Sequence, residues 1–538
     1  MKKDSLLKST GLFGIATLMS RILGLVRDSC IAAFVPHVWQ DIFWAGFKIP
    51  STCRQLFAEG ALSAAFIPLL TRVREREGEE AVRIASAAVF RALAITVGAV
   101  SVLAILLAPW FVPILLQFPQ ELNLPDELQP LALQMQVMPS ENWRVEAGVW
   151  ATQMMFPFLF FIALSAWAMG ILNTYRIFFI PALAPTLFNA SLIVGCFVGA
   201  WCYGAVGFSL MTIMIAAVII GGFLQFVIQI FPARKINYFP PPWASPFHPK
   251  VGMFLKILAP SVFGLAIYQI NSLITQTCFA SQYGSGGISQ MNYAFRLIQF
   301  PLGVIGVALA TASFPRIAQY FEQGKHEEAG KTLINVIKYL TLLMIPSAVG
   351  LIVLAPEIVG VIYDRGNFHS SGWLQPTVEV LVMYCIGLFF FAIVKVLVRT
   401  FQARHDFRTP VITGIISVAF NIALCAWFVH TGWPLWSLAL ASSLASGLQM
   451  VLLLVLLWPR MKSLPLWPLV PFFIRVIIAA AGMALACRGL MELVPVFTQS
   501  QFELMARVAI VVGAGVTVFF SLGWMLFRPE LQTVLKRK

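Results

Sequence analysis

The chain has 538 residues, of which 59% are hydrophobic and only 11% are charged, and its mean hydropathy is +0.84. Soluble domains carry about 25% charged residues, so this composition excludes a soluble globular protein and indicates a membrane protein. Lys and Arg in the loops of such a protein, together with anionic-lipid contact, account for the formal charge of +14 without nucleic-acid binding.

Apolar runs of about 20 residues, the length that crosses a bilayer, recur along the whole chain. They predict an all-α, polytopic membrane protein with about fourteen transmembrane helices. The predicted spans are 12–35, 39–70, 84–115, 149–172, 179–203, 206–231, 254–280, 288–314, 333–354, 378–398, 411–429, 435–458, 469–486 and 506–527.

The Lys and Arg residues of the connecting loops predict the orientation of these helices. With the N-terminus in the cytoplasm, almost all of them fall on the cytoplasmic side, and the opposite side holds only Arg144, Arg365 and Arg488. Basic loops stay in the cytoplasm, and an even number of spans places both termini there. Because Arg21 interrupts the first apolar run, we expect a permanent helix rather than a signal peptide.

The first predicted helix carries ionised side chains at membrane depth, namely Arg21, Arg27 and Asp28. Each charge near the bilayer centre costs about 3 kcal/mol, so such residues are expected to face a watery cavity or a ligand. Arg21 and Asp28 share a helix face on which Gly24 allows a close approach. A structural ion pair that locks helices together remains an alternative for Arg21 and Asp28.

The second predicted helix is also charged, at Asp41, Lys48, Arg54 and Glu59. Pro50 breaks its hydrogen-bond ladder, which is tolerated at membrane depth where a helix lines a cavity. Arginine favours phosphate, because the guanidinium group binds two oxygens at once. Lys395 and Arg475 could belong to the cavity or reach lipid headgroups, and the sequence does not decide between these.

A faint internal repeat relates two halves of the chain. Arg54 and Pro68 in the first half correspond to Arg296 and Pro315 in the second, at offsets of 242 and 247 residues. Two six-helix halves of the same orientation explain these offsets. A ring that suits a diphosphate would then consist of Arg21, Arg27, Arg54 and Arg296.

The repeat divides the chain into an N-terminal six-helix lobe (1–235), a cytoplasmic linker (236–250), a C-terminal six-helix lobe (251–460) and an additional two-helix segment (461–538). The linker is expected to be stiff, because it contains three consecutive prolines. The eight cysteines and six histidines are dispersed without CxxC or HExxH spacing. No metal site, cofactor or disulfide framework is indicated.

Several motifs in this frame form a specific set. They are SRILGLVRD at 20–28, FKIP at 47–50, FAEGALSAAFIP at 57–68, APTLFN at 184–189 and GVIGVAL at 303–309. Together with Arg296 they resemble the MurJ (MviN) family of lipid II flippases, and the fourteen-span plan extends the resemblance over the whole chain.

The resemblance implies a MATE/MOP-type exporter fold, with two lobes around a central cavity and a final helix pair that forms a hydrophobic groove for a polyprenyl tail. It implies transport, without enzymatic activity, of the undecaprenyl-pyrophosphate-linked peptidoglycan precursor lipid II. Transport would run from the inner to the outer leaflet of the bacterial cytoplasmic (inner) membrane, by alternating access. Proton or sodium coupling stays open.

The family's functional charges carry over to individual positions. The implied substrate-binding residues are Arg21, Arg27, Lys48, Arg54 and Arg296. The candidates for gating or ion coupling are Asp28, Asp41 and Glu59. The sequence departs from the family where acidic residues are expected around Arg296, because Phe295 and Gln299 occupy those positions. Any role of those acids must be filled differently here.

The main alternative function is export of another polyprenyl-linked glycan or other anionic amphiphile. A cationic drug would favour carboxylates where this chain has arginines. An intramembrane enzyme acting on polyprenyl phosphates would need convergent acid, base or metal residues, and the loops hold no DxD motif. A silent scaffold would not require so much buried charge.

Overall fold

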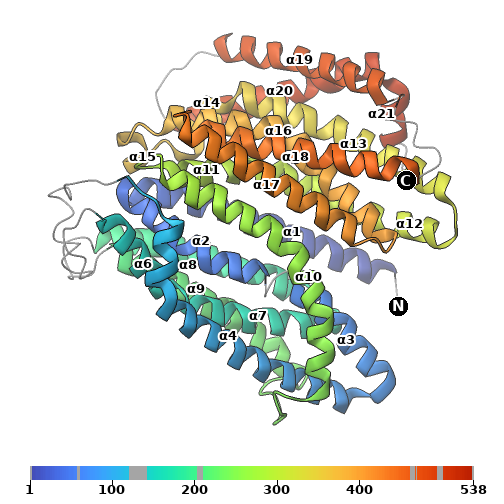
Figure 1. Ribbon diagram of the computed structural model, residues 1–538. Helices are drawn as coiled ribbons and strands as arrows, with labels where there is room; N and C mark the ends of the chain where they lie inside the picture. The colour runs from blue at the N-terminus through green and yellow to red at the C-terminus, as the bar shows by residue number, and fades with distance from the viewer. Residues whose placement is uncertain are drawn as a thin grey trace. The chain divides into compact units, whose positions relative to one another are not determined.

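A computed structural model describes residues 3–56, 61–119, 142–202, 210–460, 467, 469–493 and 501–535. The regular structure of these residues is helical throughout (Figure 1). Within them, eleven helical segments are long and apolar enough to cross a membrane. The predicted all-α, multi-pass class is therefore confirmed.

Three predicted spans are helical but are not among these eleven. They correspond to α1 (Lys3–Phe34), α2 (His37–Arg54) and α10 (Pro249–Leu273). The apolar part of α1 and the whole of α2 each contain three ionised residues. Helices of this composition face protein or water rather than lipid, so α1 and α2 are the places to look for a polar site.

The chain forms two compact units. The first comprises Met1–Ser289 with Arg365–Ser371, and the second comprises Gln290–Asp364 with Gly372–Lys538. The lobe and linker boundaries that the sequence predicts stay a prediction. The compact units instead divide after Ser289, so that α10 and the π-helical η3 (Ile274–Phe279) belong to the first.

The first unit is held by an aromatic core. Besides α1, α2, α10 and η3, its helices are α3 (Ala61–Glu77), α4 (Glu79–Leu115), α6 (Trp143–Met155), α7 (Pro157–Thr174), α8 (Phe179–Trp201), α9 (Leu210–Lys235) and the short α15 (Gly366–Ser370). The ring centroid of Phe47 lies 5.8 Å from those of Phe158 and Phe188. The buried rings of Trp39 and Trp143 meet edge to face at 5.9 Å. These contacts fix α2 against α6, α7 and α8.

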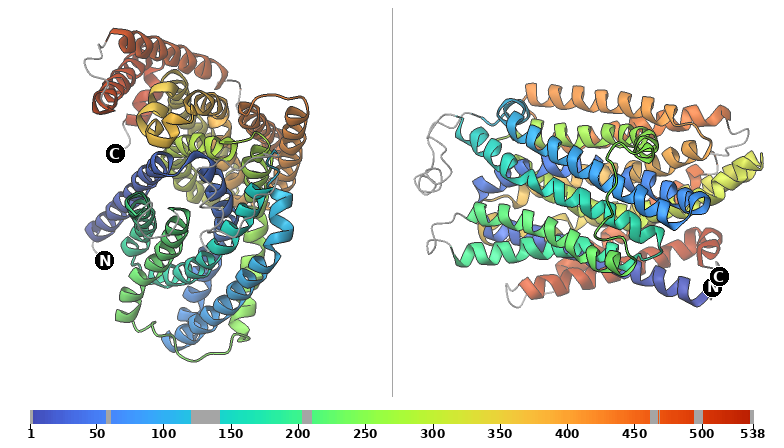
Figure 2. Two further views of the ribbon diagram at one scale, coloured as in Figure 1. Left: turned by 90° about the vertical axis from the view of Figure 1, so that its left-hand side faces the viewer. Right: turned by 90° about the horizontal axis from the view of Figure 1, so that it is seen from below.

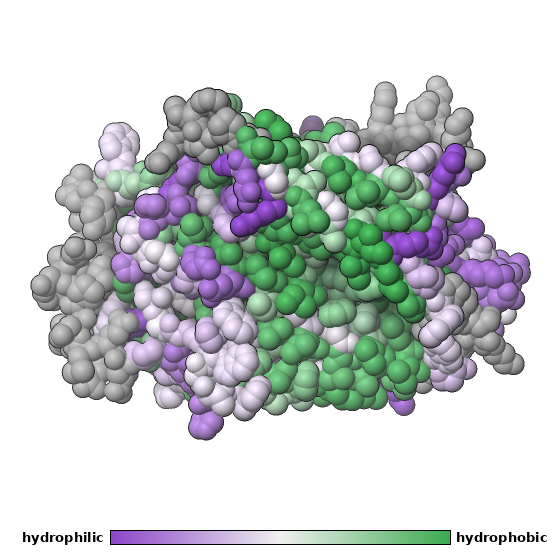
Figure 3. All heavy atoms as spheres, turned by 90° about the horizontal axis from the view of Figure 1, so that it is seen from above, coloured by the Kyte–Doolittle hydropathy of each residue, from purple (hydrophilic) through white to green (hydrophobic). Residues whose placement is uncertain are grey.

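The second unit has its own core beneath its C-terminal helices. Its elements are α11 (Gly287–Pro301), which begins in the first unit, η4 (Leu302–Gly306), α12 (Val307–Glu322), α13 (His326–Val353), α14 (Ala355–Tyr363), α16 (Leu374–Ala403), α17 (Arg408–His430), α18 (Trp436–Leu457), η5 (Trp458–Arg460), α19 (Leu469–Leu493), α20 (Gln501–Leu526) and α21 (Arg528–Leu535). Phe472, Phe519 and Phe527 are buried in this core. Ile478 and Leu485 of α19 are exposed. Figure 3 shows an apolar band between hydrophilic margins on the face that it draws. Such a band is typical of a lipid-facing surface.

Local structure supports the predicted repeat. The turns after α7 and α16 each contain a left-handed residue, Arg176 at φ 63° and His405 at φ 58°. In both turns the next amide donates to the carbonyl five residues earlier, at 2.8 and 3.0 Å. Gly78 (φ 85°) and Gly324 (φ 69°) likewise connect α3 to α4 and α12 to α13. Helix ends of one type thus recur at corresponding positions of the two halves.

Replacing Gly387 by alanine is expected to destabilise the second unit. A Cβ atom there would lie 2.4 Å from Ser443 Oγ and 2.8 Å from Ser443 Cβ, because α16 packs closely on α18. Overpacking of this kind costs about 1–3 kcal/mol. Thermal unfolding of the detergent-solubilised protein measures the loss. The control is Gly513→Ala on α20, where a Cβ meets nothing within 4 Å, and equal melting temperatures for both variants would contradict the prediction.

Candidate functional site

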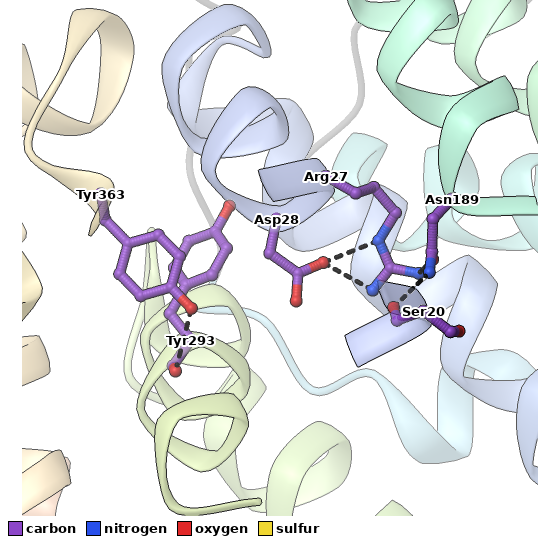
Figure 4. Close-up of polar contacts among 6 residues, drawn as sticks. All are labelled: Ser20, Arg27, Asp28, Asn189, Tyr293 and Tyr363. Carbon is purple, nitrogen blue, oxygen red and sulfur yellow. Dashed lines mark hydrogen bonds and ion pairs between the residues drawn. The ribbon is translucent and has the colours of Figure 1, made fainter. Parts of the chain in front are cut away.

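Arg27 and Asp28 form a buried pair on α1 (Figure 4). Arg27 is 4% exposed and Asp28 is 2% exposed. The Nε and Nη2 atoms of Arg27 donate to Asp28 Oδ1 at 2.8 and 2.6 Å. The sequence predicts that Arg27 and Asp28 carry charge at membrane depth, and leaves open an ion pair between helices for Asp28. The structure pairs Asp28 with its immediate neighbour.

Asn189 of α8 completes the arrangement around Arg27. Its Oδ1 accepts from Arg27 Nη1 at 3.0 Å, and its Nδ2 donates to the carbonyl of Ser20 at 2.9 Å. The close approach predicted at Gly24 is made by this amide, since a Cβ on Gly24 would lie 3.6 Å from Asn189 Nδ2. The three guanidinium nitrogens thus each donate, and α1 is tied to α8.

Two aromatic rings enclose the same guanidinium group. Arg27 Cζ lies 5.9 Å from the ring centroid of Trp44 and 5.8 Å from that of Phe188. Rings at this distance attract a cation and exclude water around it. The site therefore combines one fixed cation with one fixed anion in an apolar setting.

Asp41 lies in a second buried network. Its side chain is fully buried and accepts from the backbone amides of Gly286 at 2.6 Å and Ser289 at 2.9 Å, and from Ser289 Oγ at 2.7 Å. These groups lie at the start of α11, where a carboxylate satisfies amides that have no helical partner. Arg144 Nη2 is 3.3 Å from Asp41 Oδ2.

Arg144 is the residue that sequence reasoning missed. It was assigned to the outer surface of the membrane, yet it is 2% exposed, and its Cζ lies 4.2 Å from the ring centroid of Phe118. A signal was available, because Arg144 is the only Lys or Arg between Arg91 and Arg176. A lone arginine that becomes buried requires a counter-charge.

Lys48 is half-buried on α2 and donates to Gln276 Oε1 at 2.7 Å. Ser272 Oγ donates to the same oxygen at 3.2 Å. Gln276 belongs to η3, and π-helical turns often occur at functional sites because they turn backbone groups away from the regular ladder. Lys48 therefore links α2 to the irregular end of α10.

The other residues that the sequence predicts for the site lie on several elements. Arg21 is on α1 and Arg54 is the last residue of α2, and both are half-buried. Arg296 lies on α11, in the second unit. Glu59 lies outside the described residues. The structure brings Arg27 and Asp28 together, whereas the four-arginine ring stays a prediction.

Phe295, which stands where the family resemblance implies an acidic residue, packs against an aromatic ring. The ring of Phe295 lies 5.4 Å from that of Tyr384. Two residues earlier on α11, the rings of Tyr293 and Tyr363 are 4.7 Å apart, and Tyr363 Oη donates to the Tyr293 carbonyl at 3.4 Å (Figure 4). Phe295 therefore makes an aromatic contact where the resemblance implies an acidic residue.

Arg475 has a structural role that the sequence left open. It donates to the carbonyl of Leu526 at 3.0 Å and lies 3.3 Å from Glu530 Oε1. These contacts join α19 to the end of α20 and to α21. Across the described residues, no group of three or more His, Cys, Asp or Glu side chains could hold a metal ion.

Comparison with known proteins decides the family. The family model described as "Lipid II flippase MurJ" matches residues 31–513. The chain belongs to the MurJ lipid II flippase family. It is 30% identical to a lipid II flippase MurJ of Burkholderia cenocepacia, over 95% of each chain. It is 32% identical to a probable lipid II flippase MurJ of Vibrio cholerae, over 83% of this chain and 82% of the relative.

Solved structures agree with this assignment. A lipid II flippase MurJ in an inward closed conformation matches with TM-score 0.73 and 26% identity, over 97% of this chain and 99% of that one. An inward-facing MATE family transporter of the MOP superfamily shares the fold, with TM-score 0.60 and 15% identity, over 84% of this chain and 94% of that one. The resemblance seen in the sequence is confirmed. As a MurJ family member, the chain is a multi-pass lipid II flippase for peptidoglycan synthesis and not an enzyme.

Removing Arg144 is expected to destabilise the first unit. Arg144→Ala would leave Asp41 as a buried charge without its ion-pair partner, which costs about 3–5 kcal/mol. Thermal unfolding in detergent measures the effect. The control is Arg83→Ala, which removes an exposed ion pair with Glu80 worth at most about 1 kcal/mol.

The double variant Asp41→Asn with Arg144→Gln removes both charges and is expected to recover part of the stability lost in Arg144→Ala. If Arg144→Ala and Arg83→Ala lower the melting temperature equally, the buried pair of Asp41 and Arg144 stabilises the protein no more than an exposed pair does.

Proposed function

We propose that this chain moves lipid II from the inner to the outer leaflet of a bacterial cytoplasmic membrane by alternating access. The diphosphate is held by Arg21, Arg27, Lys48, Arg54 and Arg296, while the polyprenyl chain stays in lipid. The observation that supports this is the buried guanidinium of Arg27, which is retained at membrane depth between a carboxylate and two aromatic rings. Both termini lie in the cytoplasm, on the side of the basic loops.

Arg27 binds the diphosphate by exchanging partners. Three of its five N–H groups donate to Asp28 and Asn189. A phosphate that binds the edge formed by Nε and Nη2 displaces the Asp28 carboxylate. The released carboxylate then needs a new cation or a proton, because a lone buried charge is costly. Asp28 is therefore our candidate for coupling transport to protons or sodium.

Asp41 is assigned to gating rather than to ion exchange. Its two carboxylate oxygens already meet the Arg144 guanidinium, two backbone amides and one hydroxyl. Opening the outer side would require release of the amides at the start of α11. An inside-negative membrane potential helps to drive the anionic headgroup outward, by about 2.3 kcal/mol per charge per 100 mV.

Replacing Asp28 by asparagine is expected to strengthen binding of the anionic lipid and to weaken transport. The amide lacks the charge that competes with the diphosphate for Arg27, and it cannot take up the proton or cation that the released carboxylate needs. Native mass spectrometry with lipid II measures binding, and flipping in vesicles with an imposed ion gradient measures coupling. The control is Glu379→Gln, an exposed acid on α16. Unchanged ion dependence in Asp28→Asn would contradict the coupling role.

The function itself is tested by complementation. The chain is expected to restore growth, and exposure of lipid II at the outer leaflet, in a bacterium depleted of its own flippase. Arg27→Ala and Arg296→Ala are expected to lose this exposure at equal membrane abundance, because each removes a phosphate-binding group. The matched control Arg83→Ala is expected to keep it.

Two other outcomes have distinct meanings. If both arginine variants restore exposure, the flippase assignment stands and the proposed site is wrong. If the correctly inserted parent chain fails in several hosts, another polyprenyl-linked glycan becomes the leading substrate.

A further inference from the structure

The loop between α9 and α10, residues 236–248, is fastened to the first unit. Tyr238 is 2% exposed, and its Oη donates to Glu79 Oε1 at 3.0 Å. Tyr175 also donates to Glu79, and its Oη lies 2.5 Å from that of Tyr238. Burial and the contact with Glu79 raise the pKa of Tyr175 to about 12, so its hydroxyl stays protonated as a donor. The predicted stiff linker is thus held by side-chain contacts as well as by its prolines.

Arg91 of α4 fastens the middle of the loop. Its Nη1 donates to the carbonyl of Pro242 at 2.6 Å, and its Cζ lies 4.4 Å from the ring centroid of Trp243. The loop lies at the edge of the unit, below α4 and α10 in Figure 1 and at the bottom of the left view in Figure 2.

The position of Arg91 sets the depth of the loop. Arg91 precedes Leu115, the last residue of α4, by 24 residues, or about 36 Å at the rise of an α-helix. The hydrocarbon core of a bilayer is about 30 Å thick. If the far end of α4 reaches the opposite surface, Arg91 and the loop lie at the membrane–water interface.

The fastened loop presents two large aromatic side chains outward. Trp243 is 83% exposed and Phe247 is 92% exposed, whereas Ala244 between them is buried. Lys235 at the end of α9 and Lys256 on α10, which precede and follow the two aromatic residues in sequence, are also exposed. Aromatic rings at interface depth beside lysines are typical of contact with lipid headgroups, and the lysines favour anionic ones.

We infer that the α9–α10 loop is a lipid-docking element, whose Trp243 and Phe247 enter the headgroup region of the membrane among anionic phospholipids. This role is separate from the transport site, since the loop contacts described above are made with Tyr175, Glu79 and Arg91. A protein partner is disfavoured, because at this depth the rings are surrounded by lipid before any other molecule.

Photo-crosslinking tests the inference. The photoreactive amino acid p-benzoylphenylalanine replaces Trp243 or Phe247 in the full chain, reconstituted in vesicles of phosphatidylcholine with or without phosphatidylglycerol. After illumination, mass spectrometry of the protein counts lipid adducts. We expect adducts at both positions, with phosphatidylglycerol over-represented relative to its share of the vesicle. The control places the same residue at Gln323, an exposed polar position in the turn after α12, and several-fold fewer adducts are expected there.

A second variant pair separates anchoring from folding. Trp243→Ala with Phe247→Ala is expected to melt like the parent in detergent, and to lose the extra stability that phosphatidylglycerol gives the parent. Trp201→Ala with Phe502→Ala removes two other exposed aromatic residues and is expected to keep it. Equal adduct yields at 243, 247 and 323, cross-links to protein instead of lipid, or unchanged stabilisation by phosphatidylglycerol would each overturn the inference.

Discussion

The free-energy cost of burying an ionised side chain in an apolar environment determines how the helices of this protein contact one another. Each buried charge whose contacts are described above has a polar partner, and each partnership joins two helices or fixes a helix end. Arg27, which is paired with Asp28, reaches Asn189 on α8, and Asp41 reaches Arg144 on α6. Hydrophobic packing cannot specify helix rotation so closely in lipid, because every apolar face is equally acceptable there.

The helical class and most spans were predictable from the sequence, because twenty-residue apolar runs have one physical explanation. The unusual character of α1 and α2 was predictable as well, since charges in such runs are conspicuous. The ion pairs that these charged residues form were not predictable. Asp28 could have turned toward Arg21 or toward Arg27, and residue spacing alone does not settle which rotamers meet.

Arg144 shows a second limit of sequence reasoning. Hydropathy placed it at the end of a loop, and only the packing of α6 against α2 reveals that it is buried. In the internal repeat, the backbone conformation is the same in both halves although the residues differ. Arg176 and His405 share a backbone conformation although their side chains differ, so the helix-ending turns are retained where side-chain identity is not. Phe295 on α11 likewise packs on Tyr384 at a position where the resemblance implies an acid.

The Arg27–Asp28 pair also bears on ion leakage. A lone guanidinium at membrane depth would attract chloride and inorganic phosphate, and their passage would dissipate the membrane voltage. The paired group presents a dipole rather than a net charge, so a small hydrated anion gains little by entering. A lipid confined to the bilayer arrives at a much higher local concentration and can compete for the arginine. The pair thus lets a cationic binding group stay in the membrane without making the protein an anion channel.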